Sequence, residues 1–201
     1  EFYEQSLALS RRLDETQRLE KRFFMIYAIH NLGNMAKCQS DFKSALTLME
    51  EAMTLMRELG NKWYIARELP TVGFVNRHLG NYRQAAADFK ESLILSRELN
   101  NKECLAACLE GYVGLAVAQT QPNRAARLGG AAEVLREAVG MPIPLSERSD
   151  YDQTIALAYD ALGETAFAAA WAAGRAMTLE QAVAYALEET SASEHLPGSD
   201  S

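Results

Sequence analysis

Residues 52–59 read AMTLMREL and residues 92–99 read SLILSREL, so two closely similar stretches begin 40 positions apart. A related stretch, SLALSRRL, occupies residues 6–13. The same 40-residue spacing separates Gly33 from Gly73. Self-similarity at a fixed period of this size is typical of stacked units that bury their apolar faces only against their neighbours. The sequence therefore predicts a repeat array.

Each unit is predicted to be a pair of helices. Between 42 and 59, apolar residues recur every three or four positions, which is the spacing of one helix face. Gly60 can close this helix in the left-handed conformation. A second helix of similar length precedes each such helix, and tight turns make the pairs antiparallel hairpins. These preceding helices are predicted at 23–38, 63–79 and 103–119.

Pro70 interrupts the predicted helix 63–79. A proline inside a helix removes one backbone hydrogen bond and costs about 3 kcal/mol unless the packing accommodates the kink. The carbonyl of Ala66 is the group that loses its partner. Solvation of this carbonyl by water is the preferred interpretation, and acceptance of a hydrogen bond from a ligand is the alternative.

The repeat period ends after Val139. Two prolines make 140–144 a stiff connector, and three further helices are predicted at 146–162, 164–173 and 178 to about 189. Ser146 is expected to cap the first, and Thr178 with Gln181 forms a capping box for the third. We therefore expect a repeat array over 1–139, a helical capping module over 140–190 and a disordered tail over 191–201.

Composition narrows the class of partner. The 201 residues carry a net charge of −7, which disfavours direct binding to nucleic acid or to anionic membranes. No stretch approaches the roughly 18 apolar residues of a membrane span. Three cysteines, an odd number, indicate a reducing and hence cytoplasmic setting, with all three thiols buried. Tyr3 aligns with Met49 and Phe89 inside their helices, so the chain is expected to belong to a longer protein.

No catalytic motif or metal site is predicted. The Ser-x-x-Lys spacing of 40–43 has no nucleophile in the equivalent 80–83, so it is interpreted as turn chemistry. Cys104 and Cys108 share a helix face but lack a second pair of ligands, so no metal is expected. No cofactor is predicted. The two tryptophans and the methionine-rich stretch 49–56 are interpreted as core.

The hairpins resemble tetratricopeptide repeats over roughly residues 1–139. The matching positions carry a large then a small residue in the first helix, an aromatic after the turn, and small residues in the second helix. They are Leu32, Gly33, Phe42, Ala45 and Ala52 in one repeat and Val72, Gly73, Gly80, Tyr82, Ala85 and Phe89 in the next. The last repeat is degenerate. This resemblance implies an all-α, right-handed superhelix with a C-terminal helical cap.

The C-terminal stretch carries a second resemblance. Residues 124–133 and 174–182 look like the terminal segment of bacterial multi-domain signalling ATPases. That group includes transcription regulators of the LuxR and antibiotic-regulatory types, in which a nucleotide-binding ATPase precedes the repeats. The resemblance implies a role in signal transduction or transcription regulation.

In tetratricopeptide arrays the first helices line a concave groove. The inward-facing positions correspond here to a mixed set of aromatic, charged and amide side chains, for which a protein or peptide segment bearing a carboxylate is the expected guest. These protein- or peptide-binding candidates are Tyr27, His30, Asn34, Lys37, Arg67, Phe74, Arg77, His78 and Glu110. The clamp of chaperone-binding repeats is not reproduced, because its key positions hold His30, Thr71, Ala107 and Gly111.

The function expected is non-enzymatic recognition of a protein, of a peptide, or of upstream domains of the same polypeptide. Two alternatives stay open. One is a small-molecule sensor resembling the maltose-type activator, with its ligand in the groove. The other is self-association into a homodimer through the N-terminal half-repeat, at Phe2, Tyr3 and Leu7.

Overall fold

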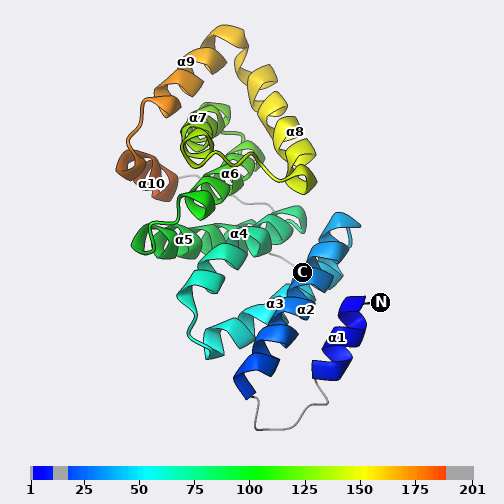
Figure 1. Ribbon diagram of the computed structural model, residues 1–201. Helices are drawn as coiled ribbons and strands as arrows, with labels where there is room; N and C mark the ends of the chain where they lie inside the picture. Colours follow the sequence, from blue (N-terminus) through cyan, green and yellow to red (C-terminus); the bar gives the residue numbers. More distant parts are fainter. Residues whose placement is uncertain (1, 11–17, 189–201) are drawn as a thin grey trace.

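Helical hairpins stack on one another in the order of the sequence (Figure 1). The computed structural model describes residues 2–10 and 18–188, and no strand occurs within these ranges. This arrangement confirms the predicted all-α solenoid. The helices are α1 (Phe2–Ser10), α2 (Arg18–Cys38), α3 (Phe42–Glu58), α4 (Lys62–His78), α5 (Tyr82–Glu98), α6 (Lys102–Ala118), α7 (Pro122–Val139), α8 (Leu145–Leu162), α9 (Glu164–Arg175) and α10 (Leu179–Leu187).

The turns between helices use the residues that the repeat pattern indicated. Gly60 has φ 66° and Asn100, one period later, has φ 55°, so both occupy the left-handed conformation that closes a helix. Asn61 and Asn101 then cap the next helix, because each side-chain oxygen accepts a backbone N–H three residues on, with N···O distances of 3.2 Å. The 40-residue period is therefore a period of turn chemistry as well as of packing.

Phe89 of α5 packs against two glycines, one on each neighbouring helix. Its ring is 1% exposed and lies against Gly73 of α4 and Gly111 of α6. A Cβ atom at Gly73 would stand 2.6 Å from Phe89 Cε1, so only glycine allows the ring this position. Gly33 faces Met49 in the same way, with a Cβ-to-Cγ distance of 3.1 Å. The two glycines therefore occupy equivalent positions, one repeat apart, and the contact at Gly33 is less tight.

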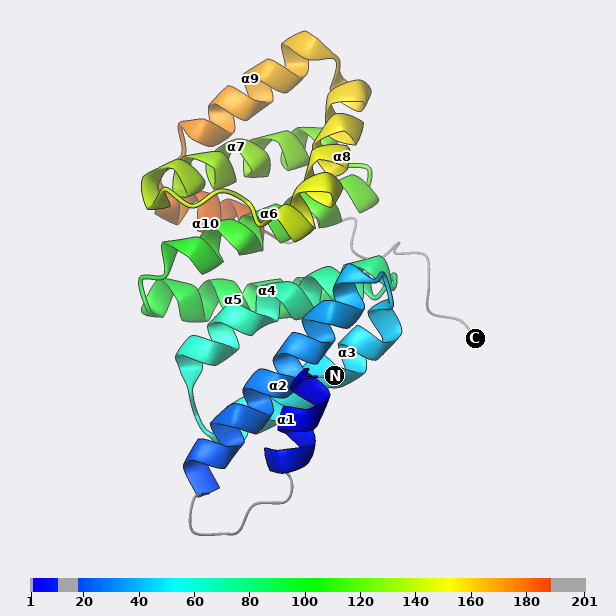
Figure 2. The same cartoon turned by 45° about the vertical axis from the view of Figure 1, so that its right-hand side comes forward.

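The last repeat is covered by the C-terminal helices. Helix α9 lies along α7 (Figure 2), and α10 packs against α6 and α7. The α7–α9 contact is close enough for backbone to meet backbone, since a Cβ at Gly174 would overlap the carbonyl of Arg127. Trp171 packs over Gly129, and its indole N–H donates to Glu133 Oε2 at 2.8 Å. The division at residue 139 stays a prediction.

The hydrogen bond that Pro70 removes from the helix is replaced by a side chain of the same protein. Ser92 of α5 is fully buried, and its hydroxyl donates to the carbonyl oxygen of Ala66 at 2.6 Å. The partner of this carbonyl is therefore a side chain of the same protein. Ser92 lies on the second helix of the same hairpin, and its hydroxyl takes the place of the N–H donor that Pro70 lacks.

Several local expectations were wrong. Helix α8 begins at Leu145 with Pro144 as its N-cap, so Ser146 lies inside the first turn and does not cap it. Cys38 is exposed because it ends α2 at the turn, although Cys104 and Cys108 are buried as expected. Trp63 is 45% exposed and is not core.

Other local expectations are confirmed. The methionines of 49–56 are buried, and Thr178 and Gln181 form the capping box. The third C-terminal helix ends at Leu187. The predicted tail at 191–201 and the side chain of Leu7 lie outside the described residues.

Alanine substitutions at these two glycines are predicted to affect stability differently. Gly73→Ala should lower the free energy of unfolding by about 1–3 kcal/mol, because Phe89 is held by Gly111 on its other side and cannot move away. Gly33→Ala should be neutral or stabilising, because the flexible Met49 can yield and alanine favours the helix by up to about 1 kcal/mol. Urea unfolding measures the free energy of unfolding of both variants. Equal effects would show that the packing of Phe89 against Gly73 and Gly111 does not decide stability.

The serine that serves the kinked helix can be tested by a double-mutant cycle. Ser92→Ala should destabilise the protein by about 1–3 kcal/mol, because it leaves the Ala66 carbonyl buried without a donor. Pro70→Ala restores a backbone N–H, so the double variant should recover most of that loss. Additive effects of the two substitutions in urea unfolding would show that Ser92 does not replace the missing N–H.

Candidate functional site

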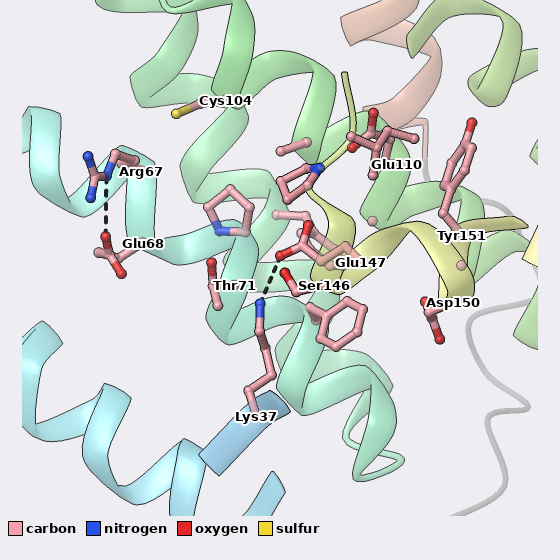
Figure 3. Close-up of a pocket in the computed structure, with 18 of the residues that line it drawn as sticks. Lys37, Arg67, Glu68, Thr71, Cys104, Glu110, Ser146, Glu147, Asp150 and Tyr151 are labelled. Atoms are coloured by element: carbon pink, nitrogen blue, oxygen red, sulfur yellow. Dashed lines mark hydrogen bonds and ion pairs between the residues drawn. The ribbon is translucent and has the colours of Figure 1, made fainter. Parts of the chain in front are cut away.

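The inner faces of α2, α4 and α6 surround a cavity of about 410 Å³ (Figure 3). Helical spacing explains the convergence, since His30, Asn34 and Lys37 are separated by four and three positions and so share one face of α2. Seven of the nine predicted residues line this cavity: His30, Asn34, Lys37, Arg67, Phe74, Arg77 and Glu110.

The other two predicted residues lie beside the cavity. Tyr27 is 59% exposed and lines a smaller cavity of about 230 Å³ with Phe23, Phe24 and Tyr64. His78 stacks on Phe42, with ring centroids 4.5 Å apart and planes at 11°. The predicted residues therefore do not line a single surface: seven line the main cavity, and Tyr27 and His78 lie beside it.

The start of α8 closes the cavity, a contribution that the sequence did not reveal. Lys37 Nζ lies 2.8 Å from Glu147 Oε1, and the two side chains point toward one another across the cavity in Figure 3. The Arg77 guanidinium lies 2.5 Å from Asp150 Oδ2, and His78 Nε2 lies 3.0 Å from Asp150 Oδ1. The basic residues expected to meet a guest already meet carboxylates of the same chain.

The environment of Asp150 favours its charged form. Partial burial raises the pKa of this carboxyl, but the hydrogen bond from His78 and the charge of Arg77 lower it more, so the net pKa is below its usual value. A carboxyl with a depressed pKa in the folded state stabilises the fold at pH values above its unfolded pKa. At neutral pH the contact therefore holds α8 to α4.

Glu110 is also paired within the protein. Its two oxygens accept from the guanidinium of Arg136 on α7 at 2.8 and 2.7 Å. Burial raises the pKa of the Glu110 carboxyl, and the bonds from Arg136 oppose that shift without cancelling it. Glu110 thus belongs to a largely buried, bidentate pair in the wall of the cavity.

A separate polar cluster lies on the side of the cavity formed by α2 and the first half of α4. His30 pairs with Glu68, and Asn34 Nδ2 lies 2.8 Å from His30 Nε2. The guanidinium of Arg67 lies 5.2 Å from the ring centroid of Trp63, a cation–π distance. Trp63 was assigned to the core, but its helical stripe is the one that faces the groove. A spacing of four residues from Trp63 to Arg67 was the signal available in the sequence.

The charges of the cavity are balanced. Its lining includes four basic side chains, at 37, 67, 77 and 136, and five carboxylates, at 68, 103, 110, 147 and 150. The cavity therefore offers an anionic guest no excess of positive charge while α8 lies in place. Burial raises the pKa of the Cys104 thiol at its edge to about 11, so this thiol is not a thiolate at neutral pH.

Residues 26–59, which form most of α2 and all of α3, match the tetratricopeptide repeat. No curated protein and no solved structure matches the chain. Such repeats generally mediate contacts between proteins. Across the residues that the structure describes, each helix is too short or too polar to span a bilayer.

The contact between Asp150 of α8 and Arg77 of α4 predicts that loss of the Asp150 carboxylate destabilises the protein more at pH 7 than at low pH. Asp150→Asn should lower the free energy of unfolding at pH 7 by about 1–2 kcal/mol, because it removes a charge-assisted contact. The loss should shrink as the pH falls from about 4, the usual pKa of an aspartate in the unfolded chain, through the lower pKa that Asp150 has in the folded chain. Urea unfolding at pH 3 and pH 7 measures this.

The matched control is Asp152→Asn on the exposed side of α8, whose carboxylate lies 3.7 Å from Arg148. An exposed pair of this kind contributes little. Equal losses for the two variants at pH 7 would show that the Arg77 contact does not hold α8.

Proposed function

We propose that this chain is a non-enzymatic recognition arm that binds a segment of a protein partner in the groove formed by α2, α4 and α6. The observation that carries the proposal is the convergence of inner-face side chains from successive repeats on one cavity of about 410 Å³. The fold supports it, because tetratricopeptide repeats generally bind proteins. A peptide carried by upstream domains of the same polypeptide is an equivalent guest.

The chemistry of the cavity suits recognition. Phe74 lies close to two cations, with Lys37 Nζ 5.3 Å and the Arg77 guanidinium 5.2 Å from its ring centroid. Aromatic and arginine side chains are enriched at the centres of protein interfaces. The resemblance of the C-terminal stretch to signalling ATPases supports a setting in a cytoplasmic signalling or transcription regulator, where occupancy of the groove would bias the state of neighbouring domains.

Two further candidates each have an observation in their favour. A small molecule is the first, because the cavity volume falls within the range of roughly 300–1,000 Å³ that small ligands fill. Self-association is the second. Phe2 is 78% exposed and Phe24 63% exposed near the N-terminal half-repeat, while Tyr3 packs against Tyr27 with ring centroids 6.2 Å apart. Light scattering and calorimetry with metabolites test these two.

Blocking the groove tests the proposal. Ala107 of α6 lines the cavity and is partly exposed, so Ala107→Arg adds a long side chain there without removing a contact. Peptides selected by display against the unchanged chain should bind this variant at least about tenfold more weakly, a loss of about 1.4 kcal/mol. Fluorescence anisotropy with the selected peptides measures the change.

The control is Ala169→Arg, the same substitution on the exposed face of α9. Binding to this control should be unchanged. Peptides that bind the two variants equally well would place recognition outside the groove.

A further inference from the structure

The groove already holds a helix, and that helix belongs to the same chain. Glu147 is 110 residues from its partner Lys37, and Asp150 is 73 residues from Arg77. The cations come from α2 and α4, and the carboxylates come from the start of α8. These contacts therefore join α8 to two helices that lie far from it in the sequence, α2 and α4.

The two carboxylates of α8 form a readable pattern. Glu147 and Asp150 are three positions apart, so they lie on the same face of the helix. Tyr151 and Thr154 continue this face into the cavity. The opposite face is open: Leu145 is 92% exposed, and Asp152 and Ala156 are also exposed. Helix α8 thus contacts the groove through one stripe, as a helical ligand does in a binding groove.

We propose that the groove is a site for an acidic helical segment of a partner protein, with two carboxylates three residues apart, and that the start of α8 occupies this site until the segment displaces it. The inference rests on the proposed function and specifies its partner.

Burial of the cations explains why the site takes an acidic helix. The side chain of Lys37 is 6% exposed and that of Arg77 is 15% exposed. A charge so far removed from water is stable only when it is paired and hydrogen-bonded. Exchange of α8 for another acidic helix keeps both pairs, whereas a neutral guest would leave both cations without partners.

Because α8 remains attached to the chain, a partner needs a minimum affinity to displace it. Thr154 and Ala158 are buried against the rest of the protein, so the start of α8 stays close to the groove after it leaves. A tethered segment competes at an effective concentration on the order of millimolar. Only a segment that binds more tightly than α8 displaces it, so the helix makes the groove selective.

The probe is a fluorescein-labelled peptide of residues 143–156, IPLSERSDYDQTIA, added to the full chain. We expect it to bind the variant Glu147→Gln/Asp150→Asn at least tenfold more tightly than the unchanged chain, because the variant no longer pairs its own cations. The single variant Asp150→Asn, which leaves Lys37 paired, should show a smaller gain. Anisotropy titrations give the affinities, and circular dichroism establishes that each variant is folded.

Matched peptides separate charge from shape. A peptide carrying both neutral substitutions should not bind, whereas a peptide with Asp152→Asn on the outward face should bind as the parent does. Adding Lys37→Gln and Arg77→Gln to the double variant should abolish binding of the parent peptide.

Any one of three results would overturn the inference. The parent peptide could bind the unchanged chain and the double variant with equal affinity, or the neutral peptide could bind as well as the parent peptide. The double variant could also show a doubled mass in light scattering, which would indicate exchange of α8 between two copies. Display-selected peptides that lose affinity for Ala107→Arg but carry no acidic pair would leave the proposed function standing while removing this inference. Failure of every peptide to respond to Ala107→Arg would remove the proposed function itself.

Discussion

The stack depends on the close approach of helices at glycine, both within a hairpin, at Gly73, and between neighbouring hairpins, at Gly111. Phe89 is buried because Gly73 on one side and Gly111 on the other leave room for its ring. Without that approach, each hairpin would expose an apolar face that it cannot cover alone. The same approach sets the inner faces of α2, α4 and α6 beside one another, so packing in the core determines the shape of the groove. The groove is in this sense a consequence of the core.

Electrostatics then determines what the groove contains. Lys37 and Arg77 are too deeply placed to rely on water, and their partners come from a helix that the chain adds after its repeats. The C-terminal helices therefore have two roles that are physically distinct. Helix α9 covers α7 through apolar, backbone and charged contacts, the last between Arg175 and both Glu133 and Glu137. The start of α8 reaches α2 and α4 through charge. Neighbouring helices, α9 and the start of α8, thus cover α7 and reach into the groove.

Much of the fold could be predicted because the deciding signals are local. Gly60, Asn100 and the Thr178–Gln181 capping box act within a few residues, and the helical period predicts which side chains face inward. The misses involve partners far apart in sequence. Nothing local indicates that Ser92 meets a carbonyl 26 residues away. The acids of α8 follow the end of the repeat period, so no register relates Glu147 to α2.

The distance between α8 and α3 tests most directly whether charge holds the start of α8 in the groove. Spin labels at Thr54→Cys and Ser149→Cys occupy exposed positions, with the exposed Cys38 replaced by serine. Pulsed dipolar spectroscopy should give one narrow distance for the otherwise unchanged chain, and a broader and longer distribution once Glu147 and Asp150 are made neutral. The same narrow distance in both proteins, or a broad one in both, would contradict a charge-held helix.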